Sequence, residues 1–156
     1  MTRDTDQLFM QEAIKQAMIA AENNEVPVGA VVTYQNKIIA KAYNQVELLK
    51  DPTAHAEMIA ITQASNFLSS KWLPECCLYV TLEPCSMCAG AMVLARLARI
   101  CFGASDPKAG ACGSVVNLVQ HEQLNHRVEI QKGIVAEFCS EILTNFFKRQ
   151  RALGKK

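Results

Sequence analysis

The sequence predicts an α/β fold in which helices cover both faces of a mixed sheet, giving three layers in a single domain over residues 1–156. β-rich runs alternate along the chain with stretches of helical spacing, an order that is typical of layered α/β proteins. Half of the 156 residues are hydrophobic, which is enough for a core without disulfide bonds. The chain contains no internal repeat and no low-complexity linker.

The expected elements follow from the spacing of apolar residues. Helical spacing over residues 8–21 predicts an amphipathic helix. Two β-rich runs, 26–34 and 38–43, are joined by three polar residues, which predicts an antiparallel hairpin, and a buried helix is expected over 54–64. The later elements are expected to be a strand (77–82), a helix (85–95), a strand (100–102), a loop rich in small residues (103–114), a short apolar stretch (115–119), a strand (127–130) and a long helix (about 134–151).

The net charge of the chain is close to zero, at +1, because it has 16 Lys and Arg residues and 15 Asp and Glu residues. A nucleic-acid partner would therefore need a local basic patch. One candidate lies at the C-terminal end, where no acidic residue follows residue 141; a solvated terminus explains the same charges. The basic residues there are Lys148, Arg149, Arg151, Lys155 and Lys156.

The seven cysteines are an odd number, and no apolar segment of the signal-peptide type follows the polar start. We therefore expect a cytoplasmic protein with reduced thiols rather than an oxidised, secreted scaffold. No run reaches the roughly 18–20 apolar residues that a membrane span needs, so no membrane partner is expected.

Cys85 and Cys88 are three positions apart at the predicted start of a helix, so both sulfur atoms can point to one side and bind one ion. The free N–H groups and the positive end of the helix dipole at such a position favour thiolates. A single Cys-x-x-Cys pair is only moderately specific, because redox proteins and structural zinc sites share it. A further ligand has to come from elsewhere in the chain.

Two sources of that ligand compete. His121 and His126 superficially complete a zinc-finger pattern with the cysteine pair. However, residues 89–120 between them number 32, whereas about 12–15 residues are typical of that pattern. The other source is His55, which lies on the first turn of a predicted helix. Two helix starts that face one point can present three ligands and leave a fourth position of zinc open, as catalytic sites do.

His55 and Glu57 are expected to begin their helix because Asp51-Pro52-Thr53 in front supplies a breaker and a capping side chain. A water on a zinc ion held by two thiolates and one imidazole ionises near neutral pH, and Glu57 can border that water and move protons. Taken alone, each residue has a structural explanation. Glu57 could stabilise the helix N-terminus through the helix dipole, and His55 could be a capped histidine of the core. Their occurrence together with the cysteine pair favours catalysis.

The order His55-x-Glu57 followed by Pro84-Cys85-x-x-Cys88 resembles the signature of the cytidine deaminase superfamily of zinc enzymes. Four longer segments are similar to the bacterial tRNA-specific adenosine deaminases, and the similarity runs over nearly the whole chain. These segments are residues 26–30, 51–57, 78–85 and 125–130.

The resemblance implies a cytidine deaminase-like fold with a five-stranded sheet between helices. It implies a homodimer that converts the wobble adenosine in the anticodon loop of a tRNA to inosine. It also implies one Zn²⁺ per subunit, held by His55, Cys85 and Cys88, with Glu57 as the catalytic acid and base.

A set of substrate-binding residues is implied as well, with Asn44 and the backbone of Ala56 holding the flipped base. Residues 102–114 resemble the substrate loop of the family, and residues 146–149 resemble its aromatic and basic end. An ordinary turn and core aromatic residues would explain the same segments without RNA, and we expect one of the two phenylalanines at 146 and 147 to be buried. The full expected set is Val28, Asn44, Ala56, Asp106, Lys108, Phe147 and Arg149.

Rival functions share parts of this pattern. A free-base or nucleoside deaminase of the guanine or cytosine type has the same zinc motif and fold. A non-catalytic zinc module would need four protein ligands, and a redox Cys-x-x-Cys protein would need no His-x-Glu partner. The substrate loop and the basic end favour RNA as the substrate.

Overall fold

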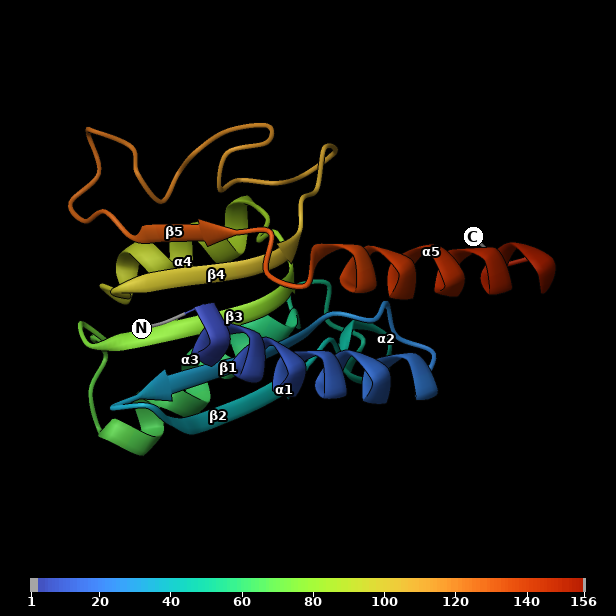
Figure 1. Ribbon diagram of the computed structural model, residues 1–156, viewed down its shortest axis with the longest axis horizontal. Coiled ribbons are helices and arrows are strands. Elements are labelled where there is room, and N and C mark those ends of the chain that lie inside the picture. Colours follow the sequence, from blue (N-terminus) through green and yellow to red (C-terminus); the bar gives the residue numbers. More distant parts are fainter. Residues whose placement is uncertain (1–2, 156) are drawn as a thin grey trace.

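The computed structural model describes residues 3–155 and contains a five-stranded mixed sheet in the order β2-β1-β3-β4-β5 (Figure 1). β1 pairs in antiparallel direction with β2 and with β3, whereas β3, β4 and β5 are parallel to one another. The predicted mixed sheet is therefore confirmed. The strands are β1 (Gly29–Tyr34), β2 (Lys37–Tyr43), β3 (Cys76–Leu82), β4 (Arg99–Ala104) and β5 (Glu129–Lys132).

Helices cover both faces of the sheet, as predicted. In Figure 1, α1 lies in front of the strands, α3 and α4 lie behind them, and α5 extends to the right from the ends of the strands. Buried residues of α5 belong to the same core as those of α1. The helices are α1 (Arg3–Glu22), α2 (Val46–Leu49), α3 (Ala56–Leu68), α4 (Ser86–Leu94) and α5 (Ala136–Ala152).

The central strand β3 contributes to two hydrophobic cores, one on each face of the sheet. Leu78 and Val80 point toward α3 and α4, whereas Cys77 and Tyr79 point toward α1 and α5. All four side chains are at most 3% exposed. Because alternate residues of a strand face opposite sides, one continuous apolar run serves both layers. Complete burial of a large apolar side chain stabilises the fold by about 1.5–3 kcal/mol.

Gly29 allows α1 to approach β1 closely. A Cβ atom at this position would lie 2.1 Å from the carbonyl oxygen of Ala13 and 2.4 Å from the amide nitrogen of Ala17. Both contacts are with backbone atoms, which cannot move away without shifting the helix. Any other residue at position 29 would therefore push α1 off the sheet.

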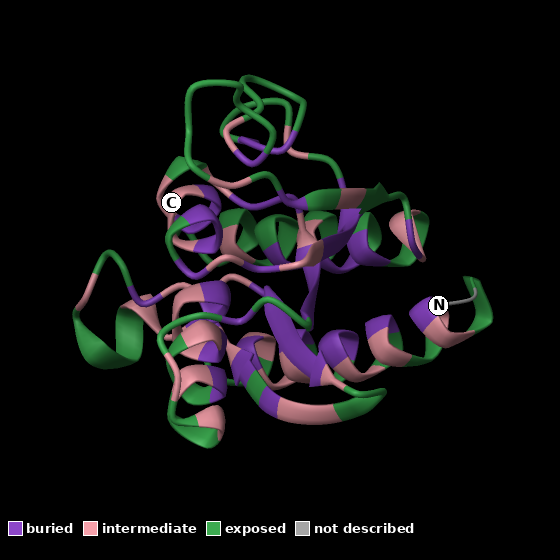
Figure 2. Cartoon of the chain, turned by 90° about the vertical axis from the view of Figure 1, so that its left-hand side faces the viewer, coloured by how far each residue is buried: buried purple, intermediate pink, exposed green. Residues whose placement is uncertain are grey.

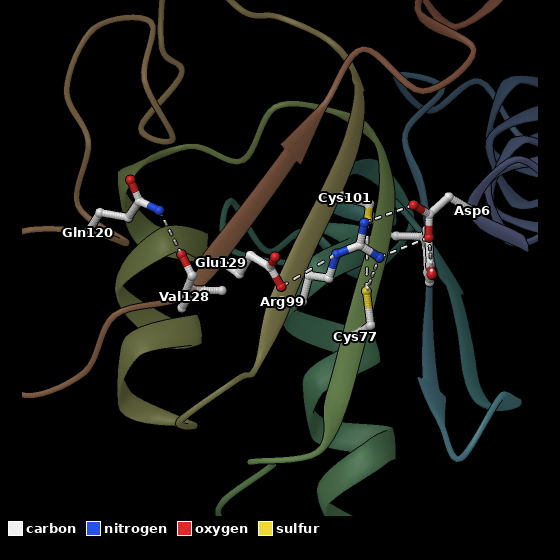
Figure 3. Close-up of polar contacts among 8 residues, drawn as sticks. Asp6, Cys77, Arg99, Cys101, Gln120, Val128 and Glu129 are labelled. Atoms are coloured by element: carbon white, nitrogen blue, oxygen red, sulfur yellow. Dashed lines mark hydrogen bonds and ion pairs between the residues drawn. The ribbon is translucent and has the colours of Figure 1, made fainter. Parts of the chain in front are cut away.

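Asp6 on α1 and Arg99 on β4 form a buried ion pair on the same face (Figure 3). The guanidinium donates to both carboxylate oxygens at 2.8 Å, and the Tyr79 hydroxyl donates to Asp6 at 2.8 Å. Burial by itself would raise the pKa of Asp6, but the hydrogen bonds from Arg99 and Tyr79 and the charge of Arg99 hold this pKa below its usual value. The pair ties the first helix to a strand 93 residues away.

Several details of the prediction are wrong. α1 begins at Arg3 rather than at residue 8, because Asp6 is already buried in its first turns. α2 was not predicted. The expected cap of α3 is absent: His55 is the N-cap residue and makes no capping hydrogen bond with its side chain. Asp51 instead accepts hydrogen bonds from the N–H and the hydroxyl of Thr53.

A long coil connects β4 and β5, and Figure 2 shows much of it as exposed. The apolar stretch 115–119 forms no strand and contributes only to an isolated bridge between Cys112 and Asn117. β5 begins at Glu129 rather than at residue 127. Within residues 3–155, no helix is both long and apolar enough to cross a membrane.

Candidate metal centre

The N-terminal ends of two helices bring three metal-binding side chains together. His55 is the N-cap residue of α3, and Cys85 is the N-cap residue of α4, three residues after the end of β3. Both cap residues have an extended backbone, with ψ angles of 150° and 177°. Because α3 and α4 pack on the same face of the sheet, these two helix ends lie side by side, with Cys88 on the first turn of α4.

The three ligand atoms are spaced for one tetrahedral ion. Nδ1 of His55 lies 3.6 Å from Sγ of Cys85 and 3.6 Å from Sγ of Cys88, and the three atoms lie within 4.8 Å of one another. Zinc bonds of about 2.0–2.1 Å to nitrogen and about 2.3 Å to sulfur, at a tetrahedral angle of about 109°, give an N–S spacing of about 3.6 Å. The group can therefore hold a metal ion, and it offers three ligands rather than four.

Hydrogen bonds within this group set its protonation. Hydrogen bonds from Cys88 and His55 lower the pKa of Cys85 to about 3, so this thiol is ionised at neutral pH. The hydrogen bond with Cys85 in turn raises the pKa of both His55 and Cys88. A thiolate thus holds protons on its two partners, and a metal cation would displace them.

Glu57 lies on the first turn of α3 and is 4% exposed. Burial raises the pKa of Glu57 to about 7, and the negative charge of Cys85 adds to the effect while His55 opposes it. A carboxyl group whose pKa lies near the working pH can both accept and donate a proton. Glu57 is therefore chemically suited to transfer protons beside the metal.

A cavity of about 620 Å³ lies next to this group and is lined by His55, Glu57 and Cys85. This volume is within the usual range of sites for small molecules, about 300–1,000 Å³. Most of the predicted substrate-binding residues line the same cavity, although they come from separate parts of the chain. They are Val28, Asn44, Ala56, Asp106 and Phe147.

Two predicted contact residues do not line the cavity. Lys108 is exposed in the loop after β4, and Arg149 borders a smaller groove between α1 and α5. The expectation for the aromatic pair on α5 is confirmed, because Phe146 is 4% exposed and Phe147 is 40% exposed. The ring of Phe147 therefore lines the cavity and is also partly exposed to solvent.

Asn44 carries an unused hydrogen-bond acceptor inside the protein. Its side chain is 7% exposed, and its Nδ2 group donates to the carbonyl oxygen of Val26 at 3.3 Å. Within residues 3–155, its Oδ1 is the single buried side-chain nitrogen or oxygen atom without a hydrogen-bond partner. Because an unpaired buried acceptor destabilises a protein by about 1–3 kcal/mol, this atom indicates a position that a ligand would satisfy.

A family model of MafB19-like deaminases matches residues 4–151 of this chain. The tRNA-specific adenosine deaminase of Bacillus subtilis is 47% identical over 150 residues, which cover 96% of this chain and 93% of that protein. The chain belongs to the tRNA-specific adenosine deaminase family.

Solved structures share the fold of this family member. A structure from a study of A-to-I editing by tRNA:A34 deaminases at the wobble position of transfer RNA matches with a TM-score of 0.84. It is 41% identical, and the match covers 86% of this chain and 98% of that chain. A guanine deaminase from Bacillus subtilis matches with a TM-score of 0.62 at 36% identity, over 69% of each chain. The expected cytidine deaminase-like fold is confirmed.

The zinc-finger alternative finds no support in this deaminase. Within residues 3–155, the group of close metal-binding side chains includes neither His121 nor His126. Nε2 of His126 lies 2.6 Å from the carbonyl oxygen of Leu97, and Nδ1 of His121 accepts a hydrogen bond from the N–H of Gln123. His121 therefore has a structural role within the connection between β4 and β5, whereas His126 links this connection to the segment just before β4.

The sequence analysis missed two buried glutamates of the deaminase, Glu25 and Glu83, which also line the cavity. Glu25 is 1% exposed and accepts hydrogen bonds from the N–H groups of Glu47 and Leu48 at 2.9 and 2.7 Å. Each glutamate lies beside an apolar residue that begins or ends a β-rich run. A charged residue next to a buried strand could have indicated a buried polar contact. The sequence did not show which residues it contacts, because these lie more than 20 positions away.

Proposed function

We propose that this chain is a zinc-dependent hydrolytic deaminase that converts adenosine to inosine at the wobble position of a tRNA anticodon. The observation that carries this proposal is the group of His55, Cys85 and Cys88 beside the buried carboxyl group of Glu57, at one end of a nucleoside-sized cavity. The family membership of the chain supports the choice of adenosine in tRNA as the substrate.

His55, Cys85 and Cys88 fit a zinc ion by their spacing and by the chemistry of their donor atoms. When bound, zinc polarises a water molecule and brings its pKa to about 7, which supplies the nucleophile of the hydrolysis. Two thiolates and one neutral imidazole would balance the charge of the ion. We infer one zinc ion per subunit.

Glu57 transfers the protons of the reaction. Its carboxylate takes a proton from the attacking water and delivers it to N1 of the adenine ring, while the water oxygen bonds to C6. Glu57 then takes the proton of the new C6 hydroxyl group and delivers it to the amine, so that the C6–N bond breaks, ammonia leaves and the C6 carbonyl of inosine forms. The burial that raises the pKa of Glu57 to about 7 makes both transfers possible near neutral pH.

Three residues on the cavity wall hold the base. Oδ1 of Asn44 accepts a hydrogen bond from the substrate, which satisfies its buried and unpaired oxygen. Ala56 is the first residue of α3, so its N–H group has no partner within the helix and can donate to the ring. Val28 supplies an apolar contact to the flat face of the base.

Residues around the mouth of the cavity contact the rest of the RNA. The bases of an anticodon loop are already unpaired, so splaying one adenosine into the cavity needs only a few kcal/mol. Phe147 stacks on a neighbouring base, which contributes about 1–3 kcal/mol. Asp106 and Lys108 contact the loop backbone, and the exposed Arg149 binds a phosphate farther from the cavity.

The enzyme acts as a homodimer, and α4 is the helix that we assign to the interface. Its outward face has no charged residue and ends in Leu94, which is 78% exposed. Leu94→Glu should lower the mass measured by light scattering from that of a dimer to that of a monomer, whereas Leu8→Glu, on exposed α1 surface, should leave it unchanged. A wild-type protein that is monomeric would refute the assignment.

We place the enzyme in the cytoplasm, because its proposed substrate is tRNA. The seven cysteines are all free, which agrees with a reducing compartment.

An ammonia-release assay tests the proposed reaction. Purified zinc-loaded protein is incubated with a tRNA anticodon stem-loop, its DNA analogue, guanine and cytidine, and the nucleoside products are identified by mass spectrometry. We expect inosine from the RNA stem-loop. Release from guanine or cytidine alone would favour the rival free-base or nucleoside deaminase, and no release from any substrate would favour a non-catalytic zinc module.

A further inference from the structure

Glu83 connects the metal centre to a loop that walls the cavity. Its side chain is 2% exposed and lies at the end of β3, two residues before the metal ligand Cys85. It lines the cavity together with Asp106 and Ala109, which belong to the coil after β4. We call residues 105–114 of this coil the wall loop. The proton transfers described above assign no role to Glu83.

Both carboxylate oxygens of Glu83 accept hydrogen bonds from the wall loop. Oε1 accepts from the N–H of Asp106 at 3.0 Å and from the hydroxyl of Ser114. Oε2 accepts from the N–H of Cys112 at 3.1 Å and from the N–H of Ser114 at 3.1 Å. One side chain thus satisfies three backbone N–H groups at the two ends of an irregular segment.

Gly110 lets the wall loop lie directly against this carboxylate. A Cβ atom at position 110 would lie 2.3–2.5 Å from Cδ and both oxygens of Glu83. The next residue, Ala111, donates its N–H to the carbonyl oxygen of Pro84 at 2.8 Å. The wall loop is therefore fixed to the same short segment that leads into Cys85.

We propose that Glu83 is a positioning residue that holds the wall loop in its substrate-binding shape and aligns it with the metal centre. This inference rests on the proposed function. A wall loop that became ordered only on binding would reduce affinity by the free energy of ordering it, whereas a loop already held in place avoids this loss. Glu83 should therefore affect substrate binding more than the proton transfers of Glu57.

Glu83→Gln tests the hydrogen bonds at almost constant volume. A glutamine has one oxygen acceptor, while the backbone donors face both oxygens of Glu83 on opposite sides. In either orientation of the amide, its NH₂ group faces at least one of these N–H groups, which leaves a buried donor unpaired. The wall loop should loosen at that end.

Gly110→Ala tests the same contact while the carboxyl group is retained. The added methyl group occupies space held by the carboxylate of Glu83, so the wall loop or the side chain must move. Asp6→Asn is the matched control, because Asp6 is equally buried and hydrogen bonded but does not line the cavity. The Asp6→Asn control shows which effects come from a general loss of stability, so that the effects of a displaced wall loop can be recognised.

The readouts are KM and kcat on the anticodon stem-loop, zinc content, and hydrogen exchange of the backbone amides of residues 105–114. We expect Glu83→Gln and Gly110→Ala to raise KM about tenfold, with kcat changed less than about threefold and zinc retained. Amide exchange in the wall loop should become faster in both variants. Asp6→Asn should change neither KM nor exchange of the wall loop.

Unchanged KM and unchanged amide exchange in both wall-loop variants would overturn the proposal, as would an equal rise of KM in Asp6→Asn. If Glu83→Gln does not fold, Gly110→Ala alone decides by the same two readouts. If wild-type protein deaminates no RNA, the proposed function fails. Amide exchange in the zinc-loaded variants then still shows whether Glu83 holds the wall loop.

Discussion

Glu57 and Asp6 are both buried carboxyl groups, but they lie on opposite faces of the sheet and their pKa values shift in opposite directions. Burial raises the pKa of Glu57 to about 7. Burial opposes the shift at Asp6, where hydrogen bonds from Arg99 and Tyr79 and the charge of Arg99 lower the pKa. Burial alone therefore does not decide the direction of the pKa shift. The hydrogen-bond and charge partners of a buried carboxyl group decide whether it is a candidate for proton transfer or part of a structural ion pair.

The largest effect is expected from removing a metal ligand on the Glu57 side of the sheet. His55→Ala should reduce zinc from one ion per chain to none and abolish deamination, because only two ligand atoms remain. His126→Ala is the control and should keep its zinc, since His126 contacts the carbonyl oxygen of Leu97 instead. Elemental analysis of the dialysed proteins measures this, and a zinc-replete His55→Ala protein would contradict the ligand assignment.

Glu57→Gln should lower kcat by about 10²–10⁴-fold, because the variant keeps the shape of the side chain but cannot transfer protons. Zinc content and affinity for the RNA stem-loop should stay close to those of wild type. Single-turnover kinetics with zinc-loaded protein measure the chemical step directly. Wild-type rates in this variant would show that Glu57 is only a helix-terminal carboxylate.

Asp6→Asn should have the reverse profile. The free energy of unfolding should fall by about 3 kcal/mol, because the guanidinium of Arg99 loses a buried counter-ion. The kcat of the variant should match that of wild type at a temperature where both are folded. Urea denaturation followed by circular dichroism gives the stability, and loss of kcat without loss of stability would place Asp6 in the catalytic machinery.

The smallest effect concerns the dependence of stability on pH. The lowered pKa of Asp6 means that its ion pair stabilises the protein above the unfolded pKa of about 3.9. This contribution is lost as the pH falls through the lower folded pKa. The stability difference between wild type and Asp6→Asn should therefore be constant from pH 7 to about pH 5 and shrink below about pH 4. A difference that grows in acid would contradict the sign of the shift.

The metal centre could be predicted from the sequence because its determinants are local. Cys85 and Cys88 lie three positions apart and His55 and Glu57 two positions apart, and the order of the two pairs matches the deaminase signature. These residues could therefore be selected although the expected cap in front of His55 is absent. The layered fold was predictable for a similar reason, since β-rich runs and helical spacing alternate along the chain.

The polar contacts of Glu83 beside the site and of Asp6 in the fold were not predictable, because the partners are far apart in the chain. Glu83 contacts residues 23 to 31 positions away, and Asp6 reaches Arg99 across 93 positions. A pattern of apolar residues contains no information on such polar pairs. The short helix α2 was missed because its four residues have no apolar periodicity of their own, and its first turn depends on hydrogen bonds to Glu25.

The bidentate contact between Asp6 and Arg99 makes the sixth residue part of the folded body rather than a dispensable leader. A chain shortened past this point would leave the guanidinium of Arg99 with the longer contact to the exposed Glu129 at 3.8 Å in place of its buried partner, and the hydrogen bond from Tyr79 to Asp6 would be lost. Fusion partners or purification tags are therefore best attached ahead of Arg3, and trimming that enters α1 should lower the yield of folded protein even though the catalytic groups are untouched.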